Sequence, residues 1–375
     1  MKNNELFKSI INDKNLFSFI NDNMLPNPDR VLSLTGRTYE AYRELKYDAH
    51  VWSCLQSRKS GLLNLDYSIS GSSEKINNDV SKMLAKLDLK SVFRSVLESL
   101  FFGFQPIEII WNRSGGKNKY IYPEQLVPKP QEWFTFDQEG KLMLKNKEHI
   151  PNYKVLCPVY EGSGMNPYGE ALLGRCYWYV KFKKGGLKMW INFIEKFGMP
   201  VLIGKFQRGS NEEESRELLD KLSDMAEDSV LVAPADIDIE IKDNQKQISS
   251  DIYLQLIKHC NSEISKALLS QTLTTELDMG SYAAAQTHYR IRREVINSDA
   301  GIVEKTMNEL IEYMVKLNFG QNIPPKFNFL ITDSENTGKF ERDLKLHSSN
   351  AVKFTQKYWK KTYGFKNEDI KNTDC

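Results

Sequence analysis

Three acidic side chains of the segment "DIDIE", Asp236, Asp238 and Glu240, are the residues most suggestive of catalysis. Alternate residues of a strand share one face, so the three carboxylates would be neighbours and could hold divalent metal ions, as in metal-dependent nucleases. The simpler interpretation is the solvated face of an amphipathic strand. A nuclease also needs a basic substrate groove, whereas this neighbourhood is acidic, so the nuclease remains the weaker alternative.

Three lysines at helical spacing, Lys181, Lys184 and Lys188, form a second chemical pattern. At about 100° per residue they fall on one side of a helix that we predict over 170–197. The aromatic residues of this helix fall on the opposite side: Tyr179, Trp190, Phe193 and Phe197. A basic row can contact phosphates, which leaves a plain nucleic-acid-binding module as another alternative, and a solvent-exposed face is the simpler interpretation. The pair Gly185-Gly186 predicts a weak point in this helix, since glycine costs about 1 kcal/mol relative to alanine in a helix interior.

Other motifs of catalysis or cofactor binding do not occur in the sequence. It contains no phosphate-binding G-x-x-x-x-G-K-[ST] loop, no G-x-G-x-x-G and no H-E-x-x-H. The five cysteines are far apart and include no C-x-x-C pair, and the five histidines lack the spacing of metal ligands. "SGGK" at 114–117 is typical of a hairpin turn rather than of a phosphate cradle. We therefore expect no cofactor and no metal site.

Length and charge limit the classes of protein that fit. A chain of 375 residues is too long for one compact core and predicts two or three structural units. The net charge of +2 argues against a protein that grips nucleic acid with its whole surface. No run approaches the roughly 18 apolar residues of a membrane helix, and the N-terminus lacks an apolar signal core, so we expect a protein made in the cytoplasm without membrane contact.

Charge is nevertheless segregated along the chain. Residues 166–197 contain six basic and two acidic residues, whereas residues 198–245 contain 12 acidic and five basic ones. The pattern of the acidic stretch predicts a small α/β unit, with strands at "VLIGKF", "SVLVAP" and "DIDIEI" and a helix over 212–227. It therefore separates two longer helical segments and differs from both in charge.

The remaining elements follow from hydrophobic periodicity and turn residues. Helical patterns cover 39–65 and 75–100, the latter as one or two helices, and "DYSIS" alternates like a strand. Antiparallel hairpins are predicted around "NRSGGKN" and around Glu139-Gly140. Helices are predicted over 251–270 and 283–318, then a strand at "KFNFLI" and a short basic helical tail. These elements indicate an α+β fold.

Several stretches, taken together and in order, resemble the portal proteins of tailed bacteriophages, specifically the Mu-like portal family. They are "DAHVWSCLQSRKSGLLNLDYSI", "FGFQPIEIIW", "NPYGEALLGRCYWYVKFKKGGLKMWINFIEKFGMPVLIGKF" and "LLSQTLTTELDMGSYAAAQTH", followed by the helix to "MVKLNFG". The resemblance covers roughly residues 40–330. The chain after Ser334 is short, which predicts a reduced crown.

The resemblance implies a portal-like α+β fold with an α/β wing, long stem helices, a small α/β clip insert and a long crossing helix. The implied parts are the N-terminal region and wing (1–165), stem helix 1 (166–197), clip (198–247), stem helix 2 (248–271), tunnel loop (272–281), crossing helix and wing return (282–335), and a short C-terminal tail or reduced crown (336–375).

The implied function is a ring, typically of twelve subunits, at one capsid vertex, through which double-stranded DNA is packaged and ejected without catalysis by the ring. The implied partners are further copies of the chain, the DNA in transit, a packaging motor (large terminase), a head-completion or adaptor protein, and the major capsid and scaffolding proteins. The implied location is the virion, with the host cytoplasm during assembly.

The resemblance also assigns roles to particular residues. Lys181, Lys184 and Lys188 become candidates for lining the channel. The tunnel loop would present polar, uncharged side chains to DNA, because each added phosphate contact strengthens binding and hinders passage. Its candidate residues are Gln271, Thr272, Thr274, Thr275, Gly280 and Ser281. The acidic clip would dock partner proteins, and its candidate residues are Glu213, Glu217 and Asp224.

The helix predicted over 283–318 is more apolar than a lone surface helix needs to be. Its apolar residues either contact neighbouring subunits of a ring or belong to the core of the single chain, and the sequence leaves both open. The residues concerned are Val303, Met307, Leu310, Ile311 and Met314.

Overall fold

The structure is a computed structural model, and it describes most of the chain from residue 24 to residue 363. The described ranges are 24–114, 120–146, 150–197, 202–206, 211–223, 230–235, 250–272, 282–330, 336–349 and 351–363. The chain divides into two compact units, of which the first contains residues 1–64 and 69–327 and the second contains residues 65–68 and 328–375.

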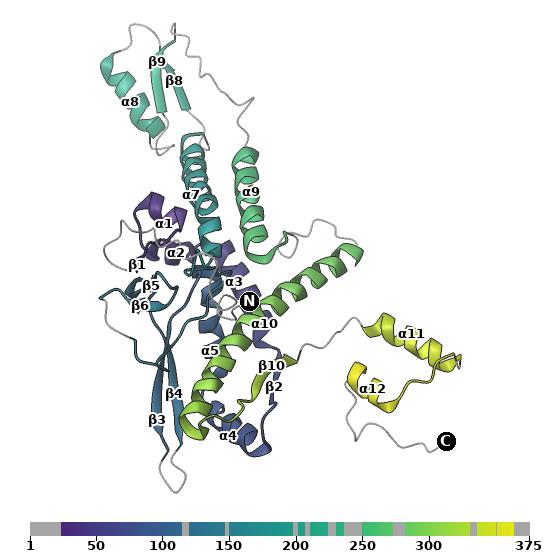
Figure 1. The fold of residues 1–375 in the computed structure, drawn as a ribbon. Coiled ribbons are helices and arrows are strands. Elements are labelled where there is room, and N and C mark those ends of the chain that lie inside the picture. Colours follow the sequence, from purple (N-terminus) through teal and green to yellow (C-terminus); the bar gives the residue numbers. More distant parts are fainter. Residues whose placement is uncertain are drawn as a thin grey trace, which may run out of the picture. The chain divides into compact units, whose positions relative to one another are not determined.

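Short helices form the N-terminal part of the first unit (Figure 1). They are α1 (Arg30–Thr35), α2 (Glu40–Leu45), α3 (Ala49–Leu63), α4 (Glu74–Leu84), α5 (Leu89–Val96) and α6 (Glu98–Phe102). The helix predicted over 39–65 is in fact two helices, because Asp48 accepts hydrogen bonds from the backbone amides of His50 and Val51 and so starts α3 as its N-cap. The segment 75–100, predicted as one or two helices, contains α5 and parts of α4 and α6.

Two small antiparallel sheets follow the helices. In the first, β3 (Ile107–Arg113) pairs with β4 (Ile121–Pro128) and with β7 (Val155–Leu156). In the second, β5 (Phe134–Asp137) lies between β1 (Met24–Leu25) and β6 (Leu142–Leu144), and a short 3-10 helix, η1 (Gln131–Trp133), precedes β5. Both predicted hairpins are confirmed, and Gly140 turns the second one at a φ of 76°.

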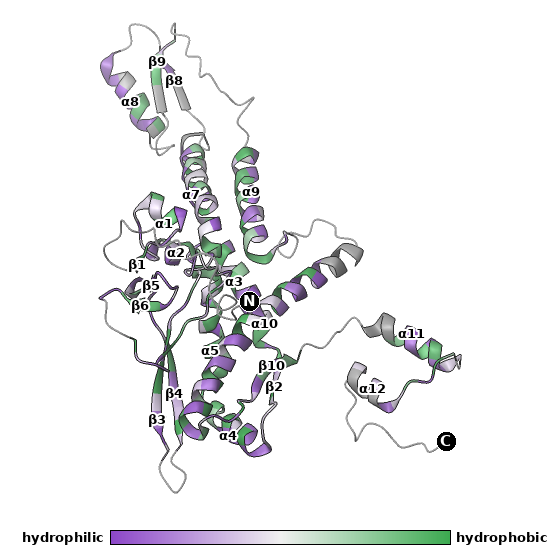
Figure 2. Ribbon diagram, viewed as in Figure 1, coloured by the Kyte–Doolittle hydropathy of each residue, from purple (hydrophilic) through white to green (hydrophobic). Residues whose placement is uncertain are grey.

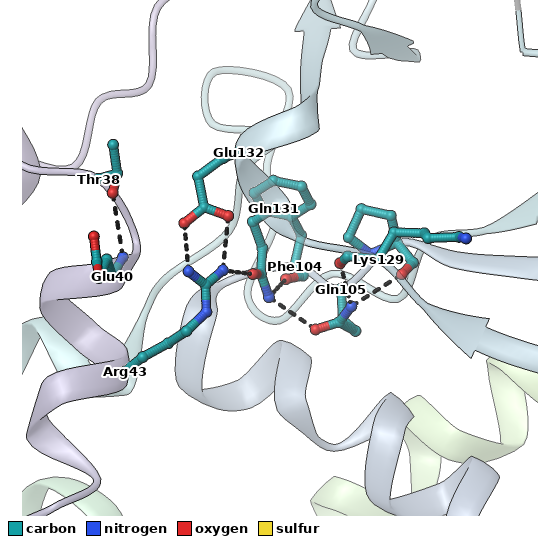
Figure 3. Close-up of polar contacts among 9 residues, drawn as sticks. Thr38, Glu40, Arg43, Phe104, Gln105, Lys129, Gln131 and Glu132 are labelled. Carbon is teal, nitrogen blue, oxygen red and sulfur yellow. Dashed lines mark hydrogen bonds and ion pairs between the residues drawn. The ribbon is translucent and has the colours of Figure 1, made fainter.

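Aromatic packing and partly buried polar bonds hold the helices against these sheets. The ring of Phe104 contacts those of Tyr39, Phe136 and Tyr168 at centroid distances of 5.8, 5.3 and 5.7 Å. Figure 3 shows how α2 is joined to η1: both terminal nitrogens of Arg43 donate to the Glu132 carboxylate at 2.7 Å, one to each oxygen. The N-terminal helices and these two sheets therefore share one packed core.

Three long elements occupy the second half of the first unit. They are α7 (Leu172–Phe197), α9 (Ser250–Leu269) and α10 (Tyr282–Phe319), with 26, 20 and 38 residues. All three confirm helices that the sequence predicts. Hydrophobic residues recur along both α7 and α9 (Figure 2), and in the part of the chain that the structure describes no helix is long and apolar enough to cross a membrane.

A small α/β unit lies in the chain between α7 and α9. The strands β8 (Leu202–Phe206) and β9 (Val230–Pro234) pair in parallel and are joined by α8 (Glu212–Ser223). Gly204 leaves room for Leu218 and Leu222 of α8, since a Cβ atom there would lie 2.6 Å from Leu222. The predicted strands at "VLIGKF" and "SVLVAP" are confirmed, whereas the strand predicted at "DIDIEI" and the end of the predicted helix beyond Ser223 lie outside the described residues.

The apolar face of α10 belongs to the core of the chain itself. Val303, Met307, Leu310, Ile311 and Met314 are all 0% exposed in the single subunit. Of the two interpretations that the sequence leaves open for these five side chains, the core of the single chain is the one confirmed. They are covered by elements of the same unit, including α4, α5 and β4.

The second unit contains part of a strand pair and two helices. β2 (Asp66–Ser70) pairs with β10 (Lys326–Leu330), and α11 (Asn336–Ser348) and α12 (Gln356–Tyr363) follow. The buried carboxylate of Asp343 accepts hydrogen bonds from the hydroxyls of Tyr358 and Tyr363, at 2.7 and 2.8 Å, which joins the two helices. The short helical tail predicted after residue 336 is confirmed.

Candidate functional site at the helix pair α7 and α9

A buried lysine joins the first half of α7 to two other helices. Lys183 Nζ donates to both carboxylate oxygens of Asp48, at 2.7 and 2.5 Å, and to the side-chain oxygen of Asn261 at 2.9 Å. Lys183 is only 6% exposed, and lysine is rarely buried unless it is paired. One side chain thus ties α7 to the start of α3 and to α9. The role of Lys183 could not be predicted from the sequence, because only the fold brings Asp48 to Lys183.

Aromatic stacking and a glycine bring the second half of α7 against α9. Trp190 and Tyr253 stack with centroids 6.5 Å apart, and Phe193 lies 5.8 Å from the same tyrosine ring. A Cβ atom on Gly186 would lie 2.7 Å from a methyl group of Leu256, so the glycine permits close approach of the two helices. The predicted aromatic side of the helix is confirmed, except that the side chain of Phe197 lies outside the described residues.

The weak point predicted at Gly185-Gly186 does not break the helix. α7 runs without interruption from Leu172 to Phe197. The packing of Gly186 on α9 offsets the low helix propensity of glycine there, whereas a Cβ atom on Gly185 would meet no atom within 4 Å. Gly186 therefore permits a helix–helix contact, whereas Gly185 makes no such contact among the described residues.

The predicted lysine row lies on one face of this continuous helix. Lys184 and Lys188 are exposed, and Lys181 is half-exposed with its Nζ 5.5 Å from the ring centroid of Tyr177. At about 100° per residue the row points away from the side that carries Trp190 and Gly186 and contacts α9. α7 thus presents a basic face on the side opposite its helix partner.

An arginine fixes the end of α9 and the middle of α10. Arg58 of α3 donates from Nη1 to the carbonyl oxygen of Leu268 at 2.6 Å. Its Nε and Nη2 donate to the two carboxylate oxygens of Asp299 at 2.7 and 2.8 Å. Burial raises the pKa of the Asp299 carboxyl, and the paired bond to Arg58 opposes that shift. Arg58 therefore joins the two helices that flank the predicted tunnel loop.

The first residues after α9 follow the point where Arg58 joins α9 to α10. Ser270 adopts a left-handed φ of 58°, and the buried side chain of Gln271 lies 3.1 Å from Nδ1 of His288. Thr272 is half-exposed. The other predicted loop residues, Thr274, Thr275, Gly280 and Ser281, lie outside the described residues.

The described cysteines of this region are poor nucleophiles. Burial raises the pKa of the Cys176 thiol to about 12, and burial also raises the pKa of Cys54 and Cys260. A thiol at such a pKa carries almost no thiolate at neutral pH. These side chains therefore serve packing, together with Ser265, whose hydroxyl lies 2.7 Å from Nε2 of His50.

The acidic candidates of the insert are only partly described. Glu213 and Glu217 are exposed on α8, and Glu217 accepts from Lys221 Nζ at 2.7 Å, a hydrogen bond that lowers its pKa. Asp224, together with the Asp236, Asp238 and Glu240 of the nuclease alternative, lies outside the described residues. Within the described residues no group of three or more His, Cys, Asp or Glu side chains could hold a metal ion.

Comparison with solved structures identifies the fold. A chain of the structure titled "Virion of native gene transfer agent (GTA) particle" superposes with a TM-score of 0.61. The alignment covers 88% of this chain and 94% of that chain at 10% sequence identity. The chain therefore shares its overall fold with that chain.

Comparison of sequences identifies the family. Residues 39–365 match the family model described as "Portal protein of Mu bacteriophage". The portal protein of Escherichia phage Mu is 23% identical over 314 residues, covering 77% of this chain and 59% of that protein. The Mu-like prophage FluMu protein gp29 of Haemophilus influenzae is 21% identical over 328 residues, covering 79% and 61%. The chain belongs to the portal family of Mu bacteriophage, and it spans about three-fifths of the length of these relatives.

Proposed function

We propose that this chain is a portal subunit, which assembles with further copies into a ring whose channel carries double-stranded DNA during packaging and ejection. The observation that carries the proposal is the helix pair α7 and α9 in a chain of this family, with Lys181, Lys184 and Lys188 on the face of α7 opposite α9. A few lysines per subunit attract the phosphate backbone without the many contacts that give tight binding. The ring would have twelve subunits and stand at one vertex of the virion.

The proposed role is structural rather than catalytic. DNA would be driven by a separate ATP-hydrolysing packaging motor, the large terminase, and retained by a head-completion or adaptor protein. The major capsid protein and scaffolding protein would surround the ring, which would be assembled in the host cytoplasm. No described residue favours the nuclease alternative.

Electron microscopy of the purified full chain tests this proposal directly. The expected result is annular particles with a central channel, in purified protein at high concentration or in particles from which it is isolated. A chain that sediments only as a monomer in both settings would contradict the portal function. Cleavage of plasmid DNA that depends on a divalent metal would favour the nuclease instead.

The segment after Leu269 is proposed to be the tunnel loop that meets the DNA. The described start of this segment follows the end of α9, where Arg58 bonds to Leu268 and Gln271 lies beside His288. Replacing Thr272, Thr274 and Thr275 with lysine should leave assembly intact and slow DNA packaging, because each subunit gains phosphate contacts. Packaging that proceeds at the parent rate at low salt would show that the segment does not meet DNA.

The acidic insert is proposed to be a docking face for the motor and then for the adaptor. Complementary charge raises association rates and selects partners. Reversing Glu213, Glu217 and Asp224 to lysine should keep assembly but slow binding of the purified motor and adaptor, most strongly at low ionic strength. Equal association rates for variant and parent at every salt concentration would exclude this face.

A further inference from the structure

Two sides of α7 carry exposed apolar side chains that the described part of the chain does not cover. Stripe 1 is defined by Trp178, Phe182, Gly185 and Met189, which recur at intervals of three and four residues. The rings of Trp178 and Phe182 stack at 6.1 Å, while Phe182 is 56% and Met189 64% exposed. A stacked, solvent-exposed aromatic pair beside a further large apolar residue is characteristic of a contact surface.

The second uncovered side is stripe 2, defined by Leu187, Ile191 and Ile194. All three are exposed, Ile191 by 55%. At about 100° per residue the four sides of α7 lie roughly 90° apart, in the order stripe 1, the α9-facing side, stripe 2 and the lysine row. The two stripes are thus back to back, and neither overlaps the side that contacts α9 or the basic side.

This layout fits one kind of partner, a second copy of the same chain. A ring is built by head-to-tail contacts, in which one patch of each subunit meets a different patch of the next. Such contacts need two unlike patches on opposite flanks of the subunit, as stripes 1 and 2 are. A contact between them leaves the lysine row uncovered on one side of the helix and α9 on the other. A two-fold dimer would need only one stripe.

Gly185 provides an independent observation. It lies in the middle of stripe 1, and a Cβ atom there would meet no atom of the described residues within 4 Å. Its neighbour Gly186 packs against Leu256 of α9, whereas no contact among the residues that the structure describes explains Gly185. Glycine disfavours a helix yet permits the closest approach of another backbone or side chain. We propose that stripe 1 of one subunit packs on stripe 2 of the next, with Gly185 as the point of closest approach. The inference rests on the proposed ring and specifies its helix–helix contact.

Two double variants test the head-to-tail arrangement. Phe182→Glu with Met189→Glu disables stripe 1, and Ile191→Glu with Ile194→Glu disables stripe 2. Each is expected to lose rings and to stay monomeric in size-exclusion chromatography with light scattering, with the circular dichroism of the parent. Mixed together, they retain one intact stripe each and are expected to form a one-to-one dimer that grows no further. Lys184→Glu with Lys188→Glu is the matched control on the same helix and should still form rings.

The outcomes separate this inference from the proposed function. Rings formed by both stripe variants would overturn the inference while leaving the portal function in place. A homodimer of the stripe 2 variant alone would show a two-fold contact through stripe 1 and would also overturn it. A parent protein that never forms rings contradicts the portal function, and the mixed dimer then still reports whether the stripes pair.

The two neighbouring glycines provide a second test that does not add charge. Gly185→Gln should leave the thermal midpoint of the monomer unchanged or higher and should lower the fraction of rings at least tenfold. Gly186→Ala places a Cβ against the flexible end of Leu256 and should keep the rings. Rings that tolerate glutamine at residue 185 as well as the parent does would rule out a close approach there.

Discussion

The two halves of α7 are one continuous helix in two different environments. Residues 172–183 have a buried side, with Leu173, Cys176 and Val180 fully buried and Lys183 paired inside the core, although Trp178 and Phe182 of stripe 1 are exposed. Residues 184–195 contact α9 on one side and leave apolar side chains exposed on two others. The first half is thus anchored by buried contacts and exposes only part of stripe 1, whereas the second half exposes the rest of stripe 1 and all of stripe 2. An exposed apolar residue is informative in this way only when it recurs along one face.

The largest loss of stability is expected from a substitution of Lys183. Replacing Lys183 with alanine leaves the buried Asp48 carboxylate without its cation, and breaking a buried ion pair in this way costs about 3–5 kcal/mol of unfolding free energy. The denaturant midpoint of the monomeric protein measures the loss.

The neighbouring Lys184 provides the control for this change. Lys184→Ala is expected to stay within about 0.5 kcal/mol of the parent, as exposed substitutions usually do. Equal losses for the two lysines would mean that the halves of α7 are not distinguished as described. Lys183→Met combined with Asp48→Asn should recover part of the loss, since no unpaired buried charge remains.

A smaller and more local effect is expected in the second half. Trp190→Ala removes the stacking on Tyr253, and aromatic pairs contribute about 0.5–1.5 kcal/mol beyond the area that they bury. Because α9 is the element that covers this half among the described residues, hydrogen exchange should accelerate in 184–195 and at the start of α9 but not in α3. Uniform acceleration through α3 would show that the two halves open as one unit.

The smallest effect concerns the pH dependence of stability and involves Glu98 of α6, a helix that contacts α7. Burial acts to raise the pKa of Glu98, but Lys59 and Lys46 outweigh it and hold the pKa below its ordinary 4.5. A lowered folded-state pKa adds stability that is present above the unfolded pKa and is lost as the pH falls through the folded value. Unfolding free energy should therefore decline below about pH 4.5, and Glu98→Gln should flatten that decline. An identical acid profile for the variant would contradict this assignment.

Much of the fold was predictable because periodicity reports local structure. The helices α7, α9 and α10 and both hairpins follow from apolar spacing and from turn residues such as Gly140. The split between α2 and α3 was not predicted, because the apolar pattern continues across residues 46–48 while the cap at Asp48 competes with it. Periodicity records which side of a helix is apolar but not which neighbour covers it. For that reason the apolar face of α10 was open to two interpretations that only packing could decide.

The candidate site was predicted less completely. The lysine row could be found because its members share one helix face. Lys183, by contrast, does not belong to the lysine row. Its partners are Asp48 and Asn261, which lie 135 and 78 residues away in the sequence. Arg58 is a similar case, since nothing near it in the sequence indicates Asp299 or the end of α9. Buried ion pairs between distant segments leave no periodic signal, so these junctions could come only from the structure.

The bond from Arg58 to the carbonyl of Leu268 joins residues 210 positions apart, and everything between them forms one closed loop of chain. The entropy of closing such a loop depends on the logarithm of its length. Removing the roughly 50 residues between α7 and α9 would shorten it by about a quarter and change the closure free energy by only about 0.2 kcal/mol. Inserts of quite different length can therefore be exchanged at this point with almost no entropic effect on the core that Arg58 closes.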